Sequence, residues 1–538
     1  MIRNPILTGF NPDPSICRVG DDYYIATSTF EWYPGVQIHH SRNLTDWELI
    51  ARPLDRADLL DMRGEPDSCG VWAPCLTWHD GLFHLVFTDV KRFDGNFKDT
   101  HNYLTTSPRI DGAWSTPVYL NSSGFDPSLF HDIDGRKWLV NMVWDHRPDR
   151  SRFGGIVLQE FSVREQRLVG PVHRIFSGSE LGLTEGPHLY RFGDYYYLLT
   201  AEGGTGYDHA VTLARSKSLL GPYEVHPERH IVTARNRPDD ELQRVGHGDI
   251  VQAADGSFYM THLCSRPLRS IRRSPLGRET ALRKLTLDSD GWFRLAVESA
   301  SPPPSAKPTY EREYRFDAEG LPNDFQWLRS PEPQALFSLS EHPGHLRLYG
   351  RESVGSPFHQ ALVARRQTHF CFEATTELEY EPDNFQQAAG LICYYNAHKF
   401  HYLYVSWDER IGKHIGIMSC EADQSLACTF PIADALIPVQ PGAPVRLRVQ
   451  VREHELLFSW ARGDDRWHTI PVILDASLLS DEAGKGDSAN FTGAFVGMCC
   501  QDLTGTRRSA DFRRFAYRER KFSETFDVSR PLVADTVA

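Results

Sequence analysis

The chain has 538 residues, of which 41% are hydrophobic and 24% are charged, so it is long enough for two or three domains with sizeable cores. Its formal net charge of −13 argues against nucleic acid or an anionic membrane as a partner and leaves neutral or cationic small molecules open. Aromatic residues make up 12% of the chain, which suits an all-β protein that binds flat, partly apolar rings such as sugars, although core packing explains most of them.

The chain begins with "MIRNPILTGFNPDP", which lacks the apolar core of a signal peptide, and no stretch approaches the roughly 20 apolar residues of a membrane span. We therefore expect a cytoplasmic protein. The ten cysteines form neither C-x-x-C pairs nor a regular framework, and we expect reduced thiols, mostly packed as small apolar groups.

Residues 10–36, "FNPDPSICRVGDDYYIATSTFEWYPGV", place Asp13 between two prolines just ahead of a strand-like run. One interpretation is a plain turn, because Asp caps the local backbone and the prolines forbid a helix. The other is a carboxylate held rigidly at the mouth of a strand, as a catalytic base requires. The motif alone leaves both open.

The first 300 residues contain five segments with one shared layout: a polar or small start, a short apolar stretch, a Gly/Asp turn and an aromatic-rich strand. Each segment is typical of a β-hairpin. They are "NPDPSICRVGDDYYIATS", "VWAPCLTWHDGLFHLVFT", "FDPSLFHDIDGRKWLVNM", "EGPHLYRFGDYYYLLTAE" and "HGDIVQAADGSFYMTH". Three further stretches, "SRNLTDWELI", "SPRIDGAWSTP" and "SKSLLGPYEVHP", fall at matching late positions and indicate outer strands with their turns.

The starts of the five segments lie 60, 53, 59 and 62 residues apart, which is enough for one four-stranded sheet apiece. They are Asp13, Ala73, Asp126, Glu185 and His247. Radial repetition of such sheets predicts a five-bladed β-propeller, whose innermost strands bring equivalent starts to one mouth. The absence of a convincing helical period disfavours a barrel of alternating strands and helices. Asp13, Asp126 and Glu185 should then face each other.

A Pro/Ser segment, "SASPPPSAKPTYE" at 299–311, marks a domain boundary. Beyond it, "PVRLRVQVREHELLFSW" alternates apolar and polar residues from Val445 onward, which indicates antiparallel sheets with one buried face. We predict a propeller at 1–300, a linker at 301–312 and a C-terminal β-sandwich at 313–538.

Six motifs in this order resemble glycoside hydrolase family 43, specifically its β-xylosidases. They are "NPDPSI", "VWAP", "FDPSLF", "TEGPHLY", "GHGDIV" and "LGRET"; the late "FTGAFVG" is also similar to the family's sandwich segment. The resemblance implies a five-bladed propeller with an appended concanavalin-like β-sandwich. It also implies an exo-acting hydrolase that releases xylose from the non-reducing end of β-1,4-xylo-oligosaccharides, and often cleaves α-L-arabinofuranosides too.

The resemblance assigns three catalytic carboxylates. Asp13 is implied as the general base, Glu185 as the general acid, and Asp126 as the residue that orients the acid and tunes its pKa. Inverting hydrolysis needs an acid and a base about 6.5–9.5 Å apart, one to protonate the leaving oxygen and one to deprotonate water. Glu185 should therefore have a raised pKa, from burial or a neighbouring charge. Without the resemblance, Asp126 and Glu185 would be interpreted as turn or loop residues.

Other site residues follow from the same resemblance. Arg278 is implied to bind adjacent sugar hydroxyls, since a guanidinium donates forked hydrogen bonds. Trp72 and Phe30 are implied to form walls of the xylose subsite. Phe491, with Phe495 as a rival, is implied to close the rim of the pocket. His247 should point into the channel beneath the acids, where some family members place a hydrated calcium ion; a structural histidine is the alternative.

Competing functions remain at this point. A sugar-binding propeller without catalysis would keep the pocket, but has little use for three carboxylates. An arabinofuranosidase or endo-arabinanase shares the fold, and a fructan or sucrose hydrolase would carry a longer Trp-Met-Asn-Asp-Pro opening, which is absent. Expected partners are xylo-oligosaccharides, arabinofuranosides and further copies of the chain in a dimer or tetramer, with neither nucleic acid nor a membrane.

Overall fold

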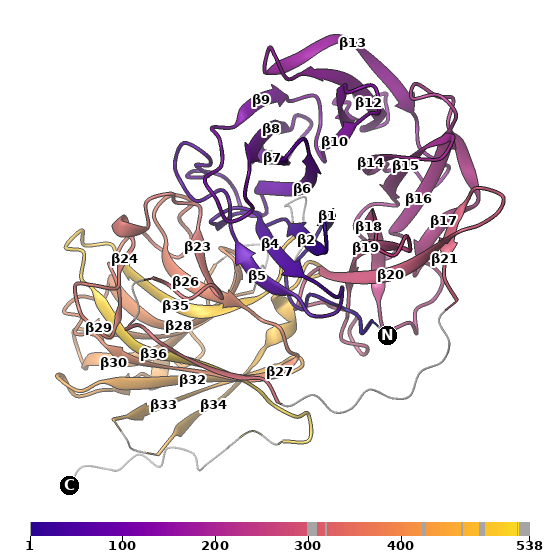
Figure 1. The fold of residues 1–538 in the computed structure, drawn as a ribbon. Coiled ribbons are helices and arrows are strands. Elements are labelled where there is room, and N and C mark those ends of the chain that lie inside the picture. Colours follow the sequence, from indigo (N-terminus) through magenta and orange to yellow (C-terminus); the bar gives the residue numbers. More distant parts are fainter. Residues whose placement is uncertain are drawn as a thin grey trace. The chain divides into compact units, whose positions relative to one another are not determined.

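The computed structural model describes residues 2–297, 309–317, 320–421, 427–463, 466–483, 490–524 and 526. The chain forms two compact units (Figure 1). The first contains Met1–Arg266 and Arg278–Pro303, and the second contains Pro267–Gly277 and Pro304–Ala538. Most of the predicted linker at 301–312 lies outside the described residues, and the first strand after it, β22, begins at Glu311. The short segment 267–277 thus belongs with the second unit although it interrupts the first in sequence.

The first unit consists of five four-stranded antiparallel sheets, each built from consecutive strands. This confirms the predicted five-bladed propeller. The blades are β1 (Ser15–Val19), β2 (Asp22–Thr27), β4 (Gln37–Ser41) and β5 (Glu48–Ala51); β6 (Gly70–His79), β7 (Leu82–Arg92), β8 (Asp99–Ser107) and β9 (Val118–Asn121); β10 (Ser128–His131), β11 (Lys137–Trp144), β12 (Phe153–Ser162) and β13 (Arg167–Phe176); β14 (Glu185–Phe192), β15 (Tyr195–Glu202), β16 (Ala210–Ser216) and β17 (Glu224–Thr233); and β18 (Gln243–Gln252), β19 (Phe258–Ser265), β20 (Glu279–Leu287) and β21 (Phe293–Leu295). A two-residue strand, β3 (Trp32–Tyr33), lies between β2 and β4 in the chain.

Turn chemistry sets the register of the hairpins. In the second blade, His79 pairs with Leu82, and the two residues between them, Asp80 (φ 53°) and Gly81 (φ 77°), are both left-handed. This is a type I′ turn, whose twist matches that of the strands it joins and which favours an Asp-Gly pair. The predicted outer stretches likewise lead into β5, β9 and β17.

The blades form a closed ring through their innermost strands. β1 packs against β6, β6 against β10, β10 against β14, β14 against β18, and β18 against β1 (Figure 1). The chain start completes the last blade, because the Ile6 and Asn11 amides donate to the Thr280 and Arg278 carbonyls at 2.8 and 2.9 Å. This closure brings the segment around Asp13 beside the start of β20, which lies about half the chain away in sequence.

Each innermost strand has a left-handed residue just before it or among its first five residues, at a similar place in each of the five repeats. These residues are Asp13 (φ 52°), Ala73 (φ 27°), Asp126 (φ 54°), Gly186 (φ 54°) and His247 (φ 48°). Four of the five are not glycine, although a left-handed conformation costs such residues about 1 kcal/mol or more. Strain of this kind is retained where it serves a site. Here the left-handed backbone sets the direction of the side chain at the equivalent point of successive repeats.

The second unit contains two large antiparallel sheets, as predicted for a sandwich. One runs β24-β25-β36-β27-β32-β33-β34 with β22 also paired to β36, and the other runs β23-β26-β35-β28-β29-β30-β31. Their bounds are β22 (Glu311–Arg315), β23 (Phe325–Leu328), β24 (Phe337–Ser338), β25 (Leu346–Leu348), β26 (Ala361–Arg366), β27 (Cys371–Glu379), β28 (Gln387–Asn396), β29 (Lys399–Asp408), β30 (Gly412–Glu421), β31 (Ile437–Pro438), β32 (Val445–Arg452), β33 (Glu455–Arg462), β34 (His468–Asp475), β35 (Phe495–Asp502) and β36 (Ala510–Glu519), with 3-10 turns η1 (Pro333–Ala335), η2 (Ala433–Ala435) and η3 (Ala476–Leu478). The alternating apolar residues from Val445 are buried.

All ten cysteines are free thiols, and nine of them are buried, Cys428 being exposed. This agrees with the expectation that most cysteines act as small core residues. In the described part of the chain, no helix has the length and apolar character needed to cross a membrane.

Candidate active site

Asp13 lies buried at the start of the first blade, with both carboxylate oxygens engaged. Its Oδ1 accepts a hydrogen bond from Arg278 Nη1 at 2.8 Å, and its Oδ2 accepts one from the Ser28 hydroxyl at 2.7 Å. Asp13 is 5% exposed and Arg278 3% exposed. A buried carboxylate is stable in its charged form only when it is paired in this way, so the site holds Asp13 as an oriented carboxylate.

Arg278 also lies against the aromatic residues that the sequence placed at the site. Its guanidinium carbon is 5.2 Å from the centroid of the Phe30 ring, and the Phe30 and Trp72 centroids are 5.7 Å apart. The Trp72 indole nitrogen donates to the Ser68 carbonyl at 3.0 Å, which fixes the plane of the ring. The structure therefore groups Asp13, Arg278, Phe30 and Trp72, as predicted, and adds an ion pair to the role expected for Arg278.

Asp126 and Glu185 are buried and interact with each other through their charges. The Gly186 amide donates to Asp126 Oδ2 at 3.1 Å, which ties the start of the third blade to that of the fourth. Burial, together with the charge of Asp13, raises the pKa of Asp126 to about 8. Burial first, and then the charge of Asp126, raises the pKa of Glu185 well above its usual value of 4.5. The pair therefore keeps a proton near neutral pH.

His247 is buried beside these carboxylates. Its Nδ1 lies 3.9 Å from Asp13 Oδ1, and a Cβ placed on Gly186 would meet the imidazole at 2.9 Å. Burial lowers the pKa of His247 to about 4, so the ring is neutral at physiological pH. The structure thus places His247 next to Asp13 and Gly186, and its expected orientation into the channel beneath the acids stays a prediction.

An aromatic row that the sequence analysis did not single out continues from Trp72. Trp72 packs against Phe125 at 5.5 Å between centroids, and Phe125 against Trp144 and Phe153 at 6.2 and 6.3 Å. The Lys98 ammonium lies 4.3 Å from the Trp144 centroid. In the sequence, the aromatic beside the "FDPS" acid was the one signal for this row.

Ser28 was also missed, although the hairpin register contains the signal. β1 pairs with β2 so that Ser15 faces Ala26. The same register, continued two residues before Ser15 and two residues after Ala26, sets Asp13 opposite Ser28. A serine opposite a predicted catalytic carboxylate therefore could have been named from the hairpin alone.

Phe491 belongs to the second unit, where it lies half-buried ahead of β35. Its expected place at the pocket rim stays a prediction. Its rival, Phe495, is fully buried on β35 with the Arg366 guanidinium 5.1 Å from its ring centroid, so it is part of the sandwich interior.

The chain has close relatives among known proteins. A family profile described as "Glycosyl hydrolases family 43" matches residues 2–293, and one described as "Beta xylosidase C-terminal Concanavalin A-like domain" matches residues 313–518. A protein from Humicola insolens named "Xylosidase/arabinosidase 43B" is 53% identical, covering 96% of this chain and 97% of its own. A "Beta-xylosidase" from Bacillus subtilis is 49% identical, covering 96% and 100%. The crystal structure of a xylan β-1,4-xylosidase from Bacillus halodurans is 48% identical with a TM-score of 0.91, covering 96% and 100%.

Proposed function

The chain belongs to glycosyl hydrolase family 43, and on that premise we propose that it is an exo-acting, inverting β-xylosidase that releases xylose from the non-reducing end of β-1,4-xylo-oligosaccharides. It is a glycoside hydrolase with xylosidase relatives over nearly its whole length. The observation that carries the proposal is the meeting of three buried carboxylates from three blades beside one buried arginine.

Glu185 is the proposed general acid. An acid must hold a proton at the working pH and release it to the leaving oxygen as the glycosidic bond breaks. Burial and the charge of Asp126 both favour the protonated form of Glu185. Asp126 accepts a hydrogen bond from the amide of Gly186, the residue that follows Glu185 in the chain. Asp126 is therefore well placed to orient the acid as well as to raise its pKa.

Asp13 is the proposed general base. A base must be ionised and fixed, so that it removes the proton of a water that attacks the anomeric carbon from the face opposite the leaving group. The bonds from Arg278 and Ser28 provide both conditions, because they stabilise the charge and set the carboxylate plane. The strained backbone of Asp13 (φ 52°) is then part of how the base is aimed.

The sugar is proposed to lie against Phe30 and Trp72, with Arg278 donating to its hydroxyls and Phe491 closing the rim. Aromatic faces and a guanidinium are suited to a neutral ring with adjacent hydroxyls. α-L-Arabinofuranosidase activity is a second proposed function, favoured by the 53% identical relative, which is named a xylosidase/arabinosidase. Arabinose and xylose are both pentoses, so one subsite can accept either ring.

Xylotetraose separates exo from endo action. The exo mode predicts xylose and xylotriose as the first products, in equal amounts, when the early time course is followed by chromatography. Xylobiose appearing first, at the expense of xylose, would contradict release of single units from one end.

The Asp126→Asn variant tests the tuning of the acid. Asparagine keeps an oxygen for the Gly186 amide but removes a charge that raises the pKa of Glu185. Since activity is lost as the pH rises through the pKa of the acid, the basic limb of the kcat profile should move to lower pH, and kcat at its optimum should fall by roughly tenfold or more. A lower kcat with an unmoved basic limb would show that Asp126 does not tune Glu185.

The Ser28→Ala variant tests the orientation of the base. Losing one oriented hydrogen bond to Asp13 should lower kcat by about tenfold and change KM little, since such bonds are worth about 1–1.5 kcal/mol. The control is Ser41→Ala, which removes another buried hydroxyl from the same blade. Equal kinetics for the two variants would remove Ser28 from the machinery.

A calcium ion at His247 remains a proposal. The neutral imidazole offers one nitrogen lone pair, whereas calcium prefers six to eight oxygen ligands. Among the described residues, no group of three potential ligands includes His247, so the residues present fit only a strongly hydrated cation. Loss of activity with a chelator and its return with Ca²⁺ are the expected results; full activity after exhaustive chelation would contradict the proposal.

A cytoplasmic location and assembly into dimers or tetramers also stay predictions. Nucleic acid and membranes are not expected partners, because the chain carries a net charge of −13.

A further inference from the structure

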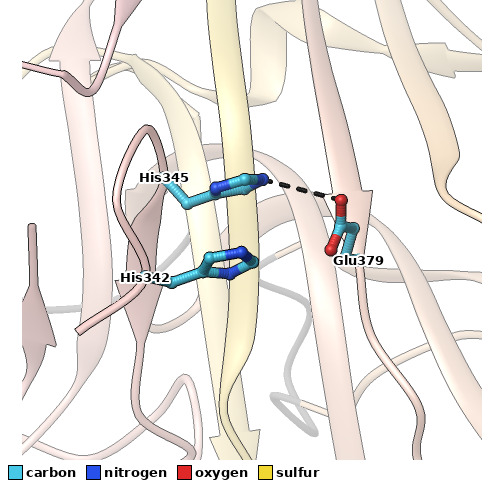
Figure 2. Close-up of side chains that lie close together, drawn as sticks. All are labelled: His342, His345 and Glu379. Atoms are coloured by element: carbon cyan, nitrogen blue, oxygen red, sulfur yellow. Dashed lines mark ion pairs between the residues drawn. The ribbon is translucent and has the colours of Figure 1, made fainter.

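A cluster of metal-ligating side chains lies in the sandwich unit, separate from the carboxylate site. His342, His345 and Glu379 each offer a ligand atom, and these atoms lie within 4.8 Å of one another (Figure 2). The histidines precede β25, and Glu379 is the last residue of β27. Both imidazole rings project toward the carboxylate in Figure 2.

The two histidines are set side by side by a tight turn. The His345 amide donates to the His342 carbonyl at 3.1 Å, with Pro343 second and Gly344 (φ 81°) third in the turn. This is the sequence and backbone of a type II turn. The imidazole rings consequently stack with centroids 3.8 Å apart and planes 14° from parallel. The pair is therefore held in place by the backbone before any ligand arrives.

His345 presents a lone pair to a carboxylate. Its Nδ1 lies 3.2 Å from the Pro343 carbonyl oxygen, a contact that requires the proton on Nδ1 and leaves Nε2 as an acceptor. Nε2 is buried, makes no hydrogen bond and lies 3.6 Å from Glu379 Oε1. Two electron-rich atoms that face each other at this distance are stabilised only by a cation between them.

The ring of His342 lies beside a carboxylate, as the rings of metal-ligating histidines usually do. Its Nδ1 lies 3.0 Å from Asp511 Oδ2, and Asp511 is itself held by Arg347 through bonds of 2.7 and 2.8 Å. The two atoms do not meet in hydrogen-bond geometry, but the carboxylate charge beside Nδ1 favours the tautomer with its proton there, which leaves the other ring nitrogen as a ligand. Arg347 compensates the charge of Asp511, so Glu379 supplies the uncompensated negative charge of the cluster.

We propose that this cluster binds a divalent transition-metal ion of the zinc class, with His342, His345 and Glu379 as ligands and water in the remaining position. Two imidazoles and one carboxylate are a ligand set that suits Zn²⁺, whereas Ca²⁺ and Mg²⁺ prefer oxygen alone. Ligand bonds of about 2.0–2.1 Å require the three atoms to draw together, and the Glu379 side chain, 42% exposed, has the freedom to do so. The bound ion would tie the turn before β25 to the end of β27, across β36.

The test uses the full chain, freed of metal with a chelator and dialysed against Zn²⁺. The variants are His345→Gln and Glu379→Gln, and the control is His359→Gln, which alters another histidine next to a glutamate (3.7 Å from Glu352) in the same unit. We expect one Zn²⁺ per wild-type and control chain, none at this site in His345→Gln, and at least tenfold weaker binding in Glu379→Gln. Zn²⁺ should also raise the unfolding temperature of wild type and control by a few degrees, and not that of His345→Gln.

Two results would overturn the proposal. Equal zinc uptake by all four proteins would place the ion elsewhere. No uptake by wild type, with a stability that falls as the pH rises and does so only while His345 is present, would show that a proton occupies the gap between His345 and Glu379. Because Glu379 is partly exposed, its variant keeps the test valid if His345→Gln fails to fold, and xylosidase activity measured before the chelator is added reports that the propeller is intact.

Discussion

Replacing Glu185 with Gln should lower kcat on xylobiose by about 10³-fold, because glutamine keeps the shape of the side chain but has no proton to give to the leaving oxygen. An aryl xyloside with an acidic leaving group, such as 2,4-dinitrophenol, should lose far less activity, since this leaving group departs without protonation. The measurement is kcat on both substrates in one preparation.

The control for Glu185→Gln is Glu224→Gln, an exposed position of the same blade, which should behave as wild type. Equal losses on both substrates would mean that Glu185 does not act as the acid. Unchanged xylobiose hydrolysis would remove it from catalysis altogether. Circular dichroism of both variants separates these results from unfolding.

Replacing Asp13 with Ala should lower kcat by about 10³-fold or more, because alanine cannot take the proton of the attacking water. The variant also breaks the buried ion pair between Asp13 and Arg278 and leaves a space beside the guanidinium. Removing one partner of a buried pair costs about 3–5 kcal/mol, so reduced stability is expected. A small anion should occupy that space. Azide should therefore both stabilise the variant and restore part of its turnover as the attacking nucleophile.

The product of azide rescue identifies the face of attack. Azide in the place of the activated water attacks opposite the leaving group, so a β-xyloside should give α-xylosyl azide, identified by NMR. Asp21→Ala, at the exposed turn of the same hairpin, should keep wild-type kinetics and show no rescue. A β-xylosyl azide product would instead indicate two successive displacements through another, intact nucleophile, and would contradict Asp13 as the base of an inverting reaction.

The propeller and the convergence of its acids could be predicted because each repeat carries its own local signal. Asp13, Asp126 and Glu185 occupy the same place in three repeats, and the hairpin register even specifies Ser28 as a neighbour of Asp13. These relations depend on strand pairing between residues close in sequence. The period of the repeats then supplies the ring.

The ion pair between Asp13 and Arg278 could not be predicted, because it depends on closure of the ring by the chain start, between residues separated by more than half of the first unit. The raised pKa of Glu185 follows from the role that the resemblance implies, and the structure agrees, whereas the raised pKa of Asp126 depends on burial, which motifs do not measure. In the sandwich, the His-Pro-Gly-His turn is readable in the sequence, but its carboxylate partner on β27 is not. The meeting of side chains from strands that are distant in the sequence but lie in one sheet is set by how the strands pack.

The anomeric configuration of the first xylose released from xylobiose tests the account most directly. NMR of the anomeric protons in the earliest minutes should show α-xylose first, followed by mutarotation, because Asp13 delivers water opposite the bond that Glu185 protonates. β-Xylose appearing first would contradict the base and acid assigned to these two residues, and intact xylobiose would contradict β-xylosidase activity itself.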